Sequence, residues 1–270
     1  MAVQAESVWL GSARQPVRLV MLASLFGTLA CSFLLIVGGL FSNPGFDMKQ
    51  FLAPADAPLA LATLILAATA LLSASIYMSD RRGVIEPEPS GFFDIVSLVC
   101  ARLSMLATAA IVLVMFFEVV SRYVFEKPTL WANELSLWIA GFVFLLAGLY
   151  AMQQRSHIRI YIIYDMLPRW LQKLSDVFSV LLIWAFTGLL IWGGYNEALS
   201  KFLRWETFGT AWDPPLPATI KPAILIIVLM VAIQALSNLI ADWNKAPEAH
   251  LPVDEIDEHE IELMRKNIEG

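Results

Sequence analysis

The sequence predicts an all-α membrane protein with six transmembrane helices and with both termini in the cytoplasm. Its 270 residues are 58% hydrophobic and only 16% charged, whereas soluble domains are about 45–50% apolar and about 25% charged. Five stretches of at least 20 residues contain no charged side chain, and about 20 such residues cross the hydrocarbon core as a helix. Lys and Arg gather on alternate connections between the stretches.

The expected spans follow from the apolar stretches, because backbone polar groups cannot be left bare in lipid and must be bonded within a helix. The five uncharged stretches are residues 19–41, 57–79, 135–154, 177–196 and 222–241. A sixth, residues 93–117, is interrupted by Arg102, which lies near enough to one end to reach the headgroups. The first stretch is too long for the core of a signal peptide, so we expect a retained helix.

The expected orientation rests on the basic residues. Eleven Lys and Arg residues lie in the N-terminal segment, the loop near residue 81, the 153–176 loop and the C-terminal segment, against six in the opposite connections. Basic residues accumulate on the cytoplasmic side of membrane proteins. An even number of spans agrees with this, because it returns the chain to the side where it began.

Breaker residues suggest four parts. The segment around Gly83, Pro87 and Pro89 has the composition of a linker between structural units. We therefore expect a two-helix N-terminal transmembrane hairpin, a cytoplasmic linker, a four-helix membrane domain and an acidic cytoplasmic tail. Their expected bounds are residues 1–79, 80–91, 92–243 and 244–270. The residues from Ala246 onward account for the net charge of −6, since the rest of the chain is balanced.

Nothing in the sequence indicates an enzyme. No nucleotide-binding, metalloprotease or nucleophile motif is present, and no basic patch suggests nucleic-acid binding. The three histidines, His157, His250 and His259, lie outside the apolar stretches, which excludes bis-histidine haem ligation within the spans. We therefore predict no catalytic residues, no metal site and no cofactor, and no residue can be assigned to substrate binding.

Charged and aromatic residues cluster instead at the ends of the spans. Glu118 and Arg122 are spaced to pair on one helix, and Glu134 suits the N-terminal end of the next helix. Trp131 and Trp138 recur with Glu134 at helical spacing. A proton or cation relay is one reading. Charges placed near span ends, with none at the centre of four spans, favour ion pairs that orient helices or contact a partner.

Two further expectations concern packing. The mixed segment 199–208 has the pattern of a loop lying in the headgroup plane. Five glycines in the fourth and fifth spans are expected to be sites where neighbouring helices approach closely. They are Gly141, Gly148, Gly188, Gly193 and Gly194.

Several short motifs, in order, resemble one known family. They are Arg122-Tyr123-Val124-Phe125, Trp131, Glu134, Trp138, Gly148, Arg155, His157-Ile158-Arg159-Ile160, Leu167-Pro168, Pro217 and Pro222. Their order and spacing over about residues 92–243 resemble the DctQ-type small permease subunit of tripartite ATP-independent periplasmic (TRAP) transporters. Two features depart from that family's pattern. Tyr161 stands where an aspartate is common, and the N-terminal hairpin exceeds the usual four helices.

The resemblance implies a multi-pass protein of the bacterial inner (cytoplasmic) membrane. It implies a large permease subunit of the DctM type as partner, a periplasmic substrate-binding protein and contact with membrane lipid. The small subunit would scaffold the large one during cation-coupled symport of an organic acid or similar solute. The residues expected to orient helices or contact the partner are Glu118, Arg122, Trp131, Glu134, Trp138, Arg155 and His157.

Two alternatives remain at this stage. A membrane anchor of a respiratory complex would have a similar composition, although the lack of histidine in the spans argues against haem. The small subunit of a tricarboxylate-type tripartite transporter would have a similar layout and would differ mainly in the motifs.

Overall fold

The structure is a computed structural model that describes residues 7–41, 47–81, 86, 89, 91–154, 164 and 167–244. Its six long helices are α1 (Arg14–Phe41), α2 (Pro58–Ser79), α3 (Phe92–Tyr123), α4 (Ala132–Gln153), α6 (Arg169–Leu203) and α7 (Leu216–Asp242). All six are long and apolar enough to cross a membrane. Three short 3₁₀ helices are η1 (Gly11–Ala13), η2 (Met48–Phe51) and η3 (Pro54–Asp56). Within the described ranges no residue is in a β-strand, and the predicted six-helix membrane fold is confirmed.

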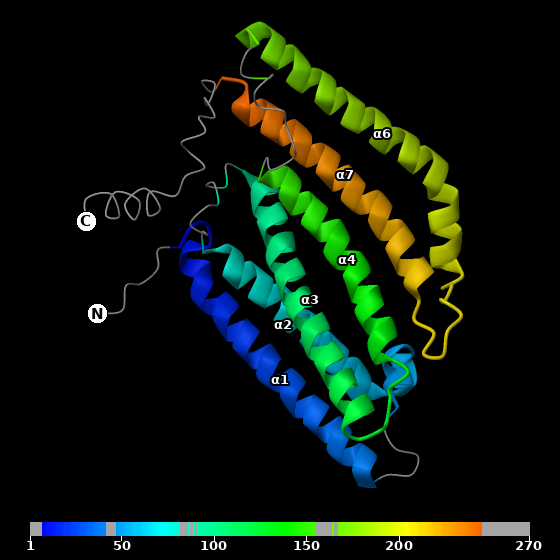
Figure 1. Ribbon diagram of the computed structural model, residues 1–270. Coiled ribbons are helices and arrows are strands. Elements are labelled where there is room, and N and C mark those ends of the chain that lie inside the picture. The colour runs from blue at the N-terminus through cyan, green and yellow to red at the C-terminus, as the bar shows by residue number, and fades with distance from the viewer. Residues whose placement is uncertain are drawn as a thin grey trace, which may run out of the picture.

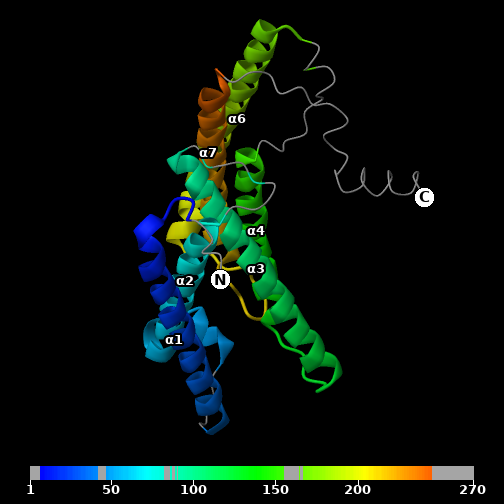
Figure 2. The same cartoon turned by 90° about the vertical axis from the view of Figure 1, so that its left-hand side faces the viewer.

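The helices form an extended row, not a closed bundle (Figure 1). Along the row the order is α1, α2, α3, α4, α7 and α6, so that α7 lies between α4 and α6. Consecutive helices along the chain run in opposite directions (Figure 1). Helix α2 crosses α3 at an angle, and the view of Figure 2 shows the α1–α2 hairpin on one side of α3.

Most helices are longer than their apolar stretches. The clearest case is α6, whose 35 residues extend past both ends of the uncharged stretch 177–196. A charged residue ends an apolar stretch in the sequence but need not end the helix, because Lys, Arg and Glu are good helix formers. The expected interfacial loop at 199–208 is therefore wrong in its first half, where Leu199, Phe202 and Leu203 continue α6.

The connection from α6 to α7, residues 204–215, is an irregular turn. Trp205, Gly209 and Asp213 all have positive φ values, of 49°, 81° and 61°. Only glycine adopts this region without steric cost, so Trp205 and Asp213 need support from their surroundings. Asp213 receives it, because its Oδ1 accepts a hydrogen bond of 2.6 Å from the amide of Gly209. Two prolines follow, and α7 begins at Leu216.

Glycines allow close helix approach at two of the five predicted positions. A Cβ on Gly141 would lie 2.8 Å from Cδ1 of Ile220 on α7, and one on Gly194 would lie 3.3 Å from Cδ2 of Leu225. For Gly148, Gly188 and Gly193 no atom of another described segment lies within 4 Å of such a Cβ, so for these three close approach stays a prediction. In an open row many helix faces have no neighbour, and sequence alone does not reveal which.

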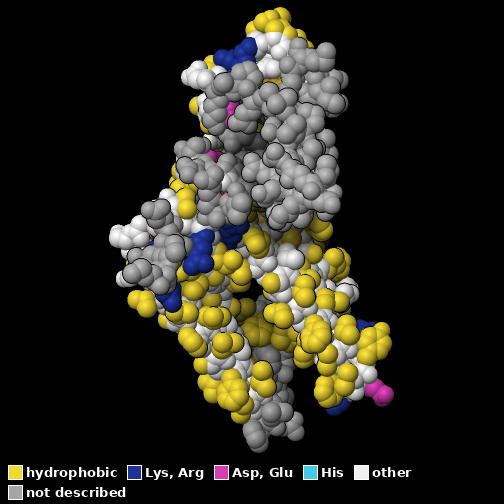
Figure 3. All heavy atoms as spheres, turned by 60° about the vertical axis from the view of Figure 1, so that its left-hand side comes forward, with side chains coloured by type: hydrophobic (Ala, Val, Ile, Leu, Met, Phe, Trp, Pro, Cys, Tyr) yellow, Lys and Arg dark blue, Asp and Glu magenta, His cyan; other side chains and the backbone are white. Residues whose placement is uncertain are grey.

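The core is small for a chain of this length. Between 6% and 22% of the residues in the six apolar helix windows are buried, and large apolar side chains such as Phe144 and Trp192 are exposed. Figure 3 shows this hydrophobic surface covering the outside of the helices. In a membrane such side chains contact lipid or another protein and not water. Their exposure on the surface of this chain is therefore expected.

Candidate functional site

The predicted residues Glu118 and Arg122 form one polar group at the end of α3. Glu118 is 3% exposed, and its Oε1 accepts hydrogen bonds of 2.9 and 2.5 Å from Nε and Nη2 of Arg122. Its Oε2 accepts a bond of 3.0 Å from the amide of Thr129 and another from the Thr129 hydroxyl. One carboxylate therefore joins α3 to the loop that leads into α4.

Trp131 and Glu134 lie at the beginning of α4. The Trp131 ring stacks on Phe117 of α3, with ring centroids 5.8 Å apart. Oε2 of Glu134 accepts a hydrogen bond of 2.7 Å from the Thr210 hydroxyl and one of 3.2 Å from the Asp213 amide. Glu134 thus fastens the positive-φ turn between α6 and α7 onto α4.

Trp138 lies one turn further along α4 and contacts α7. Its indole Nε1 donates a 2.8 Å hydrogen bond to Oγ1 of Thr219, and its ring packs edge-on against Trp212, at 6.4 Å between centroids. Trp212 is buried and comes from the same turn as Thr210 and Asp213. The structure therefore brings Glu134 and Trp138 together with this turn, which the sequence had not indicated as a partner, while Trp131 packs on α3.

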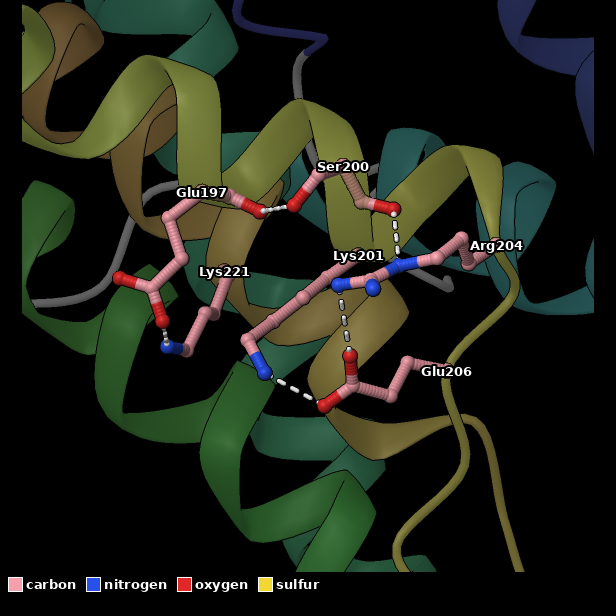
Figure 4. A network of polar contacts seen from close by, with 6 residues as sticks. All are labelled: Glu197, Ser200, Lys201, Arg204, Glu206 and Lys221. Atoms are coloured by element: carbon pink, nitrogen blue, oxygen red, sulfur yellow. Dashed lines mark hydrogen bonds and ion pairs between the residues drawn. The ribbon is translucent and has the colours of Figure 1, made fainter.

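Ion pairs surround this end of the molecule (Figure 4). Lys221 of α7 pairs with Glu197 of α6, and Lys201 pairs with Glu206 just beyond α6. Arg204 Nη2 lies 3.5 Å from Oε2 of Glu206. The hydrogen bond from Lys201 lowers the pKa of Glu206 below its ordinary value of 4.5. These pairs are partly or fully exposed, so each contributes little to stability. They link the end of α6 to α7 and to the residues just beyond α6.

The opposite end of α3, α4 and α7 holds a buried polar network that the sequence did not predict. Gln234 of α7 is 1% exposed. Its Nε2 donates to Oδ1 of Asp94 at 2.6 Å, and its Oε1 accepts from the Ser97 hydroxyl at 2.9 Å. Asn238 Nδ2 donates to the carbonyl of Met152 on α4 at 2.7 Å. A glutamine inside an otherwise apolar span was the available signal, because unbonded amides are costly in lipid.

Arg102 and the loop before α3 form a second group at this end. Arg102 Nη2 donates to Oε2 of Glu86 at 2.5 Å and to the carbonyl of Arg81 at 3.3 Å. Oε1 of Glu86 accepts a 2.8 Å hydrogen bond from the Tyr150 hydroxyl on α4. Arg102 and Asp94, which both lie on α3, have different partners. Glu86 ties the α2–α3 connection to both α3 and α4.

Two predicted residues, Arg155 and His157, lie outside the described residues. In the described ranges no group of three His, Cys, Asp or Glu side chains could hold a metal ion. A cavity of about 370 Å³ lies where α4, α6 and α7 meet; its lining is Met152, Leu182, Ile183, Phe186, Thr187, Val228 and Val231. This lining offers an anionic solute no positive charge. The polar contacts described above join helices and loops to one another.

The comparison with known families decides the identity of this helix row. Residues 111–245 match the family "Tripartite ATP-independent periplasmic transporters, DctQ component". The chain belongs to the DctQ family of TRAP transporters. It is thus a small permease subunit of that transporter class, and its family implies a role in transport rather than catalysis. The match begins within α3 and ends just after α7, so α1 and α2 lie outside it.

A curated relative supports this assignment. Over 114 residues the chain is 29% identical to the "C4-dicarboxylate TRAP transporter small permease protein DctQ" of Vibrio cholerae serotype O1. That alignment covers 40% of this chain and 46% of the relative, so the chain spans about half the length of the curated relative that it matches. No solved protein structure matches the chain. The DctQ match favours the TRAP class over a respiratory anchor or a tricarboxylate-type subunit.

Proposed function

We propose that this DctQ-family protein scaffolds a large permease subunit of the DctM type in the bacterial inner membrane. The large subunit would carry an organic acid or similar solute, delivered by a periplasmic binding protein and driven by cation symport. The DctQ match, combined with a helix row that buries so little of itself, carries this proposal. A row with exposed apolar faces on membrane-spanning helices offers the surface that a second membrane subunit needs.

The polar contacts of the chain support a fixed role over a moving one. Glu134, Trp138 and Gln234 each join a different pair of segments. Interhelical hydrogen bonds in membranes hold helices in one relative position. A solute path would require polar groups along a cavity, and the cavity between α4, α6 and α7 is lined almost entirely by apolar side chains. The apolar lining of this one cavity supports our proposal that solute binds to the partner.

We further propose that the side of the row where α1 begins at Arg14 and α7 ends at Asp242 faces the cytoplasm. The excess of basic residues in the connections on that side supports this orientation. The end formed by Glu118, Glu134 and the α6–α7 turn would then face the periplasm, where a binding protein approaches. Cysteine labelling of intact cells tests it, with Lys127→Cys expected to react and Arg18→Cys expected to be protected; the reverse pattern would refute it.

The scaffolding proposal is tested by affinity purification of the full-length chain in mild detergent. We expect a stoichiometric complex with one large many-span membrane protein, and loss of organic-acid uptake in cells that lack this chain. Recovery of the chain alone, from cells whose uptake does not depend on it, would contradict the proposal.

The site residues are tested in the same assay. Arg122→Ala and Glu134→Ala should reduce the yield of the complex and the uptake rate several-fold, because each carries hydrogen bonds that position a helix end. Lys127→Ala is the matched control, since Lys127 is an exposed charge in the same region. If both test variants behave like the control, these residues do not orient the interface.

A further inference from the structure

Four arginines gather where the N-terminal hairpin joins the rest of the molecule. Arg14 and Arg18 lie on the first turns of α1, Arg81 lies two residues after the end of α2, and Arg102 comes from α3. Contacts connect them: Arg14 reaches Asp80, which precedes Arg81, and Arg102 bonds to the carbonyl of Arg81. Figure 3 shows basic side chains at the border of the hydrophobic surface on this side of the protein.

Two of the four arginines are neutralised by buried carboxylates. Arg14 Nη1 lies 3.0 Å from Oδ2 of Asp80, and Arg102 Nη2 lies 2.5 Å from Oε2 of Glu86. Both carboxylate side chains are almost fully buried. These pairs fix the positions of Arg14 and Arg102 and cancel their charge.

The other two arginines leave a local excess of positive charge. Arg18 and Arg81 are exposed, and neither has an ion pair with any residue that the structure describes. Arg18 follows Arg14 by one helical turn and so projects from a similar face of α1. Arg81 adjoins Asp80, to which Arg14 is bound. Arg18 and Arg81 therefore both lie close in sequence to the α1–α2 junction, by which we mean the open end of the hairpin, where Arg14 at the start of α1 meets Asp80 just after α2.

An apolar track continues from Arg18 along α1. Leu25, Leu29 and Ile36 follow Arg18 at intervals of 7, 11 and 18 residues, which places them on the same helical face. Their exposed fractions are 44%, 58% and 61%. A cationic rim above an exposed apolar helix face matches a ligand with an anionic head and hydrocarbon tails. A soluble anion has no hydrocarbon chain that could contact these apolar side chains.

We propose that the α1–α2 junction binds the headgroup of an anionic phospholipid between Arg18 and Arg81, with an acyl chain along the Leu25 face of α1. Guanidinium groups bind phosphate oxygens with paired hydrogen bonds, and basic residues at the membrane surface attract anionic lipid. The site belongs to the hairpin outside the family match, so it stands whether or not the chain scaffolds a large subunit.

The experiment compares lipid retention by the full-length protein. Wild type and variants are reconstituted in nanodiscs with equal amounts of phosphatidylglycerol and phosphatidylcholine, and the retained lipids are counted by native mass spectrometry. The preference for phosphatidylglycerol should fall about fivefold for Arg18→Gln or Arg81→Gln, and about 25-fold for the double variant. Arg18→Lys with Arg81→Lys should keep most of the preference, and Lys127→Gln, an exposed charge at the other end, should keep all of it.

Three results would overturn the proposal. The first is a double Gln variant, folded by circular dichroism, with the wild-type preference. The second is full displacement of phosphatidylglycerol by millimolar inorganic phosphate, which would indicate a site for free anions. The third is an unchanged preference together with increased proteolysis of residues 246–270 in the double variant, which would assign the arginines to the acidic tail of this chain.

Discussion

The N-terminal hairpin and the other four helices satisfy their polar side chains in different ways. In the hairpin helices, hydroxyl groups bond to their own helix: Ser24 donates to the carbonyl of Val20, and Ser75 to that of Leu71, each at 2.7 Å. In the other four helices some hydroxyls do the same, but further polar side chains bond across helices, as Ser97 does to Gln234 and Trp138 to Thr219.

This difference indicates how each part is positioned. A hydroxyl bonded to its own backbone lets two helices pack closely but does not select their relative orientation. The hairpin helices approach closely at Gly27, where an added Cβ would lie 3.1 Å from Cδ1 of Leu66. A bond between side chains of different helices is directional and fixes their register. The polar tie of the hairpin lies at one end, where Asp80 accepts bonds from Ser7, Trp9 and Leu10.

The largest expected effect comes from Gln234→Leu. It removes two interhelical bonds and takes a donor away from the buried Asp94 carboxylate, so the free energy of unfolding should fall by about 2–3 kcal/mol. Unfolding in mixed micelles at increasing SDS fraction measures it. The matched control is Thr63→Val in the hairpin, whose hydroxyl bonds only to the carbonyl of Leu59. Equal losses in the two variants would remove the contrast between the regions.

The tie at Asp80 should make the hairpin sensitive to pH. Burial acts to raise the pKa of Asp80, but hydrogen bonds from the amides of Leu10 and Trp9 and the Ser7 hydroxyl, with the charge of Arg14, outweigh it and lower the pKa below 3.8. Because the folded-state pKa is the lower one, the stabilisation is complete above the unfolded pKa and disappears as pH falls through the folded pKa.

We therefore expect constant stability between about pH 7 and pH 5 and a decline at lower pH. Asp80→Asn should cost about 1–2 kcal/mol at pH 7 and should flatten the decline, as measured by micellar unfolding across this range. Glu126→Gln, an exposed carboxylate outside the hairpin, should leave the profile unchanged. A decline of the same size in the Asp80→Asn variant would show that other carboxylates cause it.

The smallest expected effect comes from comparing two buried serines, one in each region. Ser97 and Ser75 are 1% and 0% exposed, but Ser97 bonds across helices and Ser75 within its own. Ser97→Ala should lower the free energy of unfolding by about 0.5–1 kcal/mol, and Ser75→Ala by a few tenths at most. The same micellar measurement on both variants checks this. A larger loss for Ser75→Ala would contradict the proposed division between directional bonds and packing.

Local spacing made part of this structure predictable. The six spans follow from apolar length, and the Glu118–Arg122 pair follows from a spacing of four residues on one helix. The partners of Glu134 and Gln234 could not be predicted in this way, because they lie 76 and 140 positions away along the chain. No pattern in one sequence states which helices are neighbours in the row. The contacts of Glu86 were not expected, because it lies in a segment that its prolines marked as a linker.

The position of α7 has a consequence for how the protein is made. Helices α4 and α6 enter the membrane before α7, yet α7 lies between them in the row. The contact faces of α4 and α6 therefore stay open to lipid until α7 has left the ribosome. Assembly of this part of the protein is a final insertion step, in which a late helix takes its place between two that are already inserted.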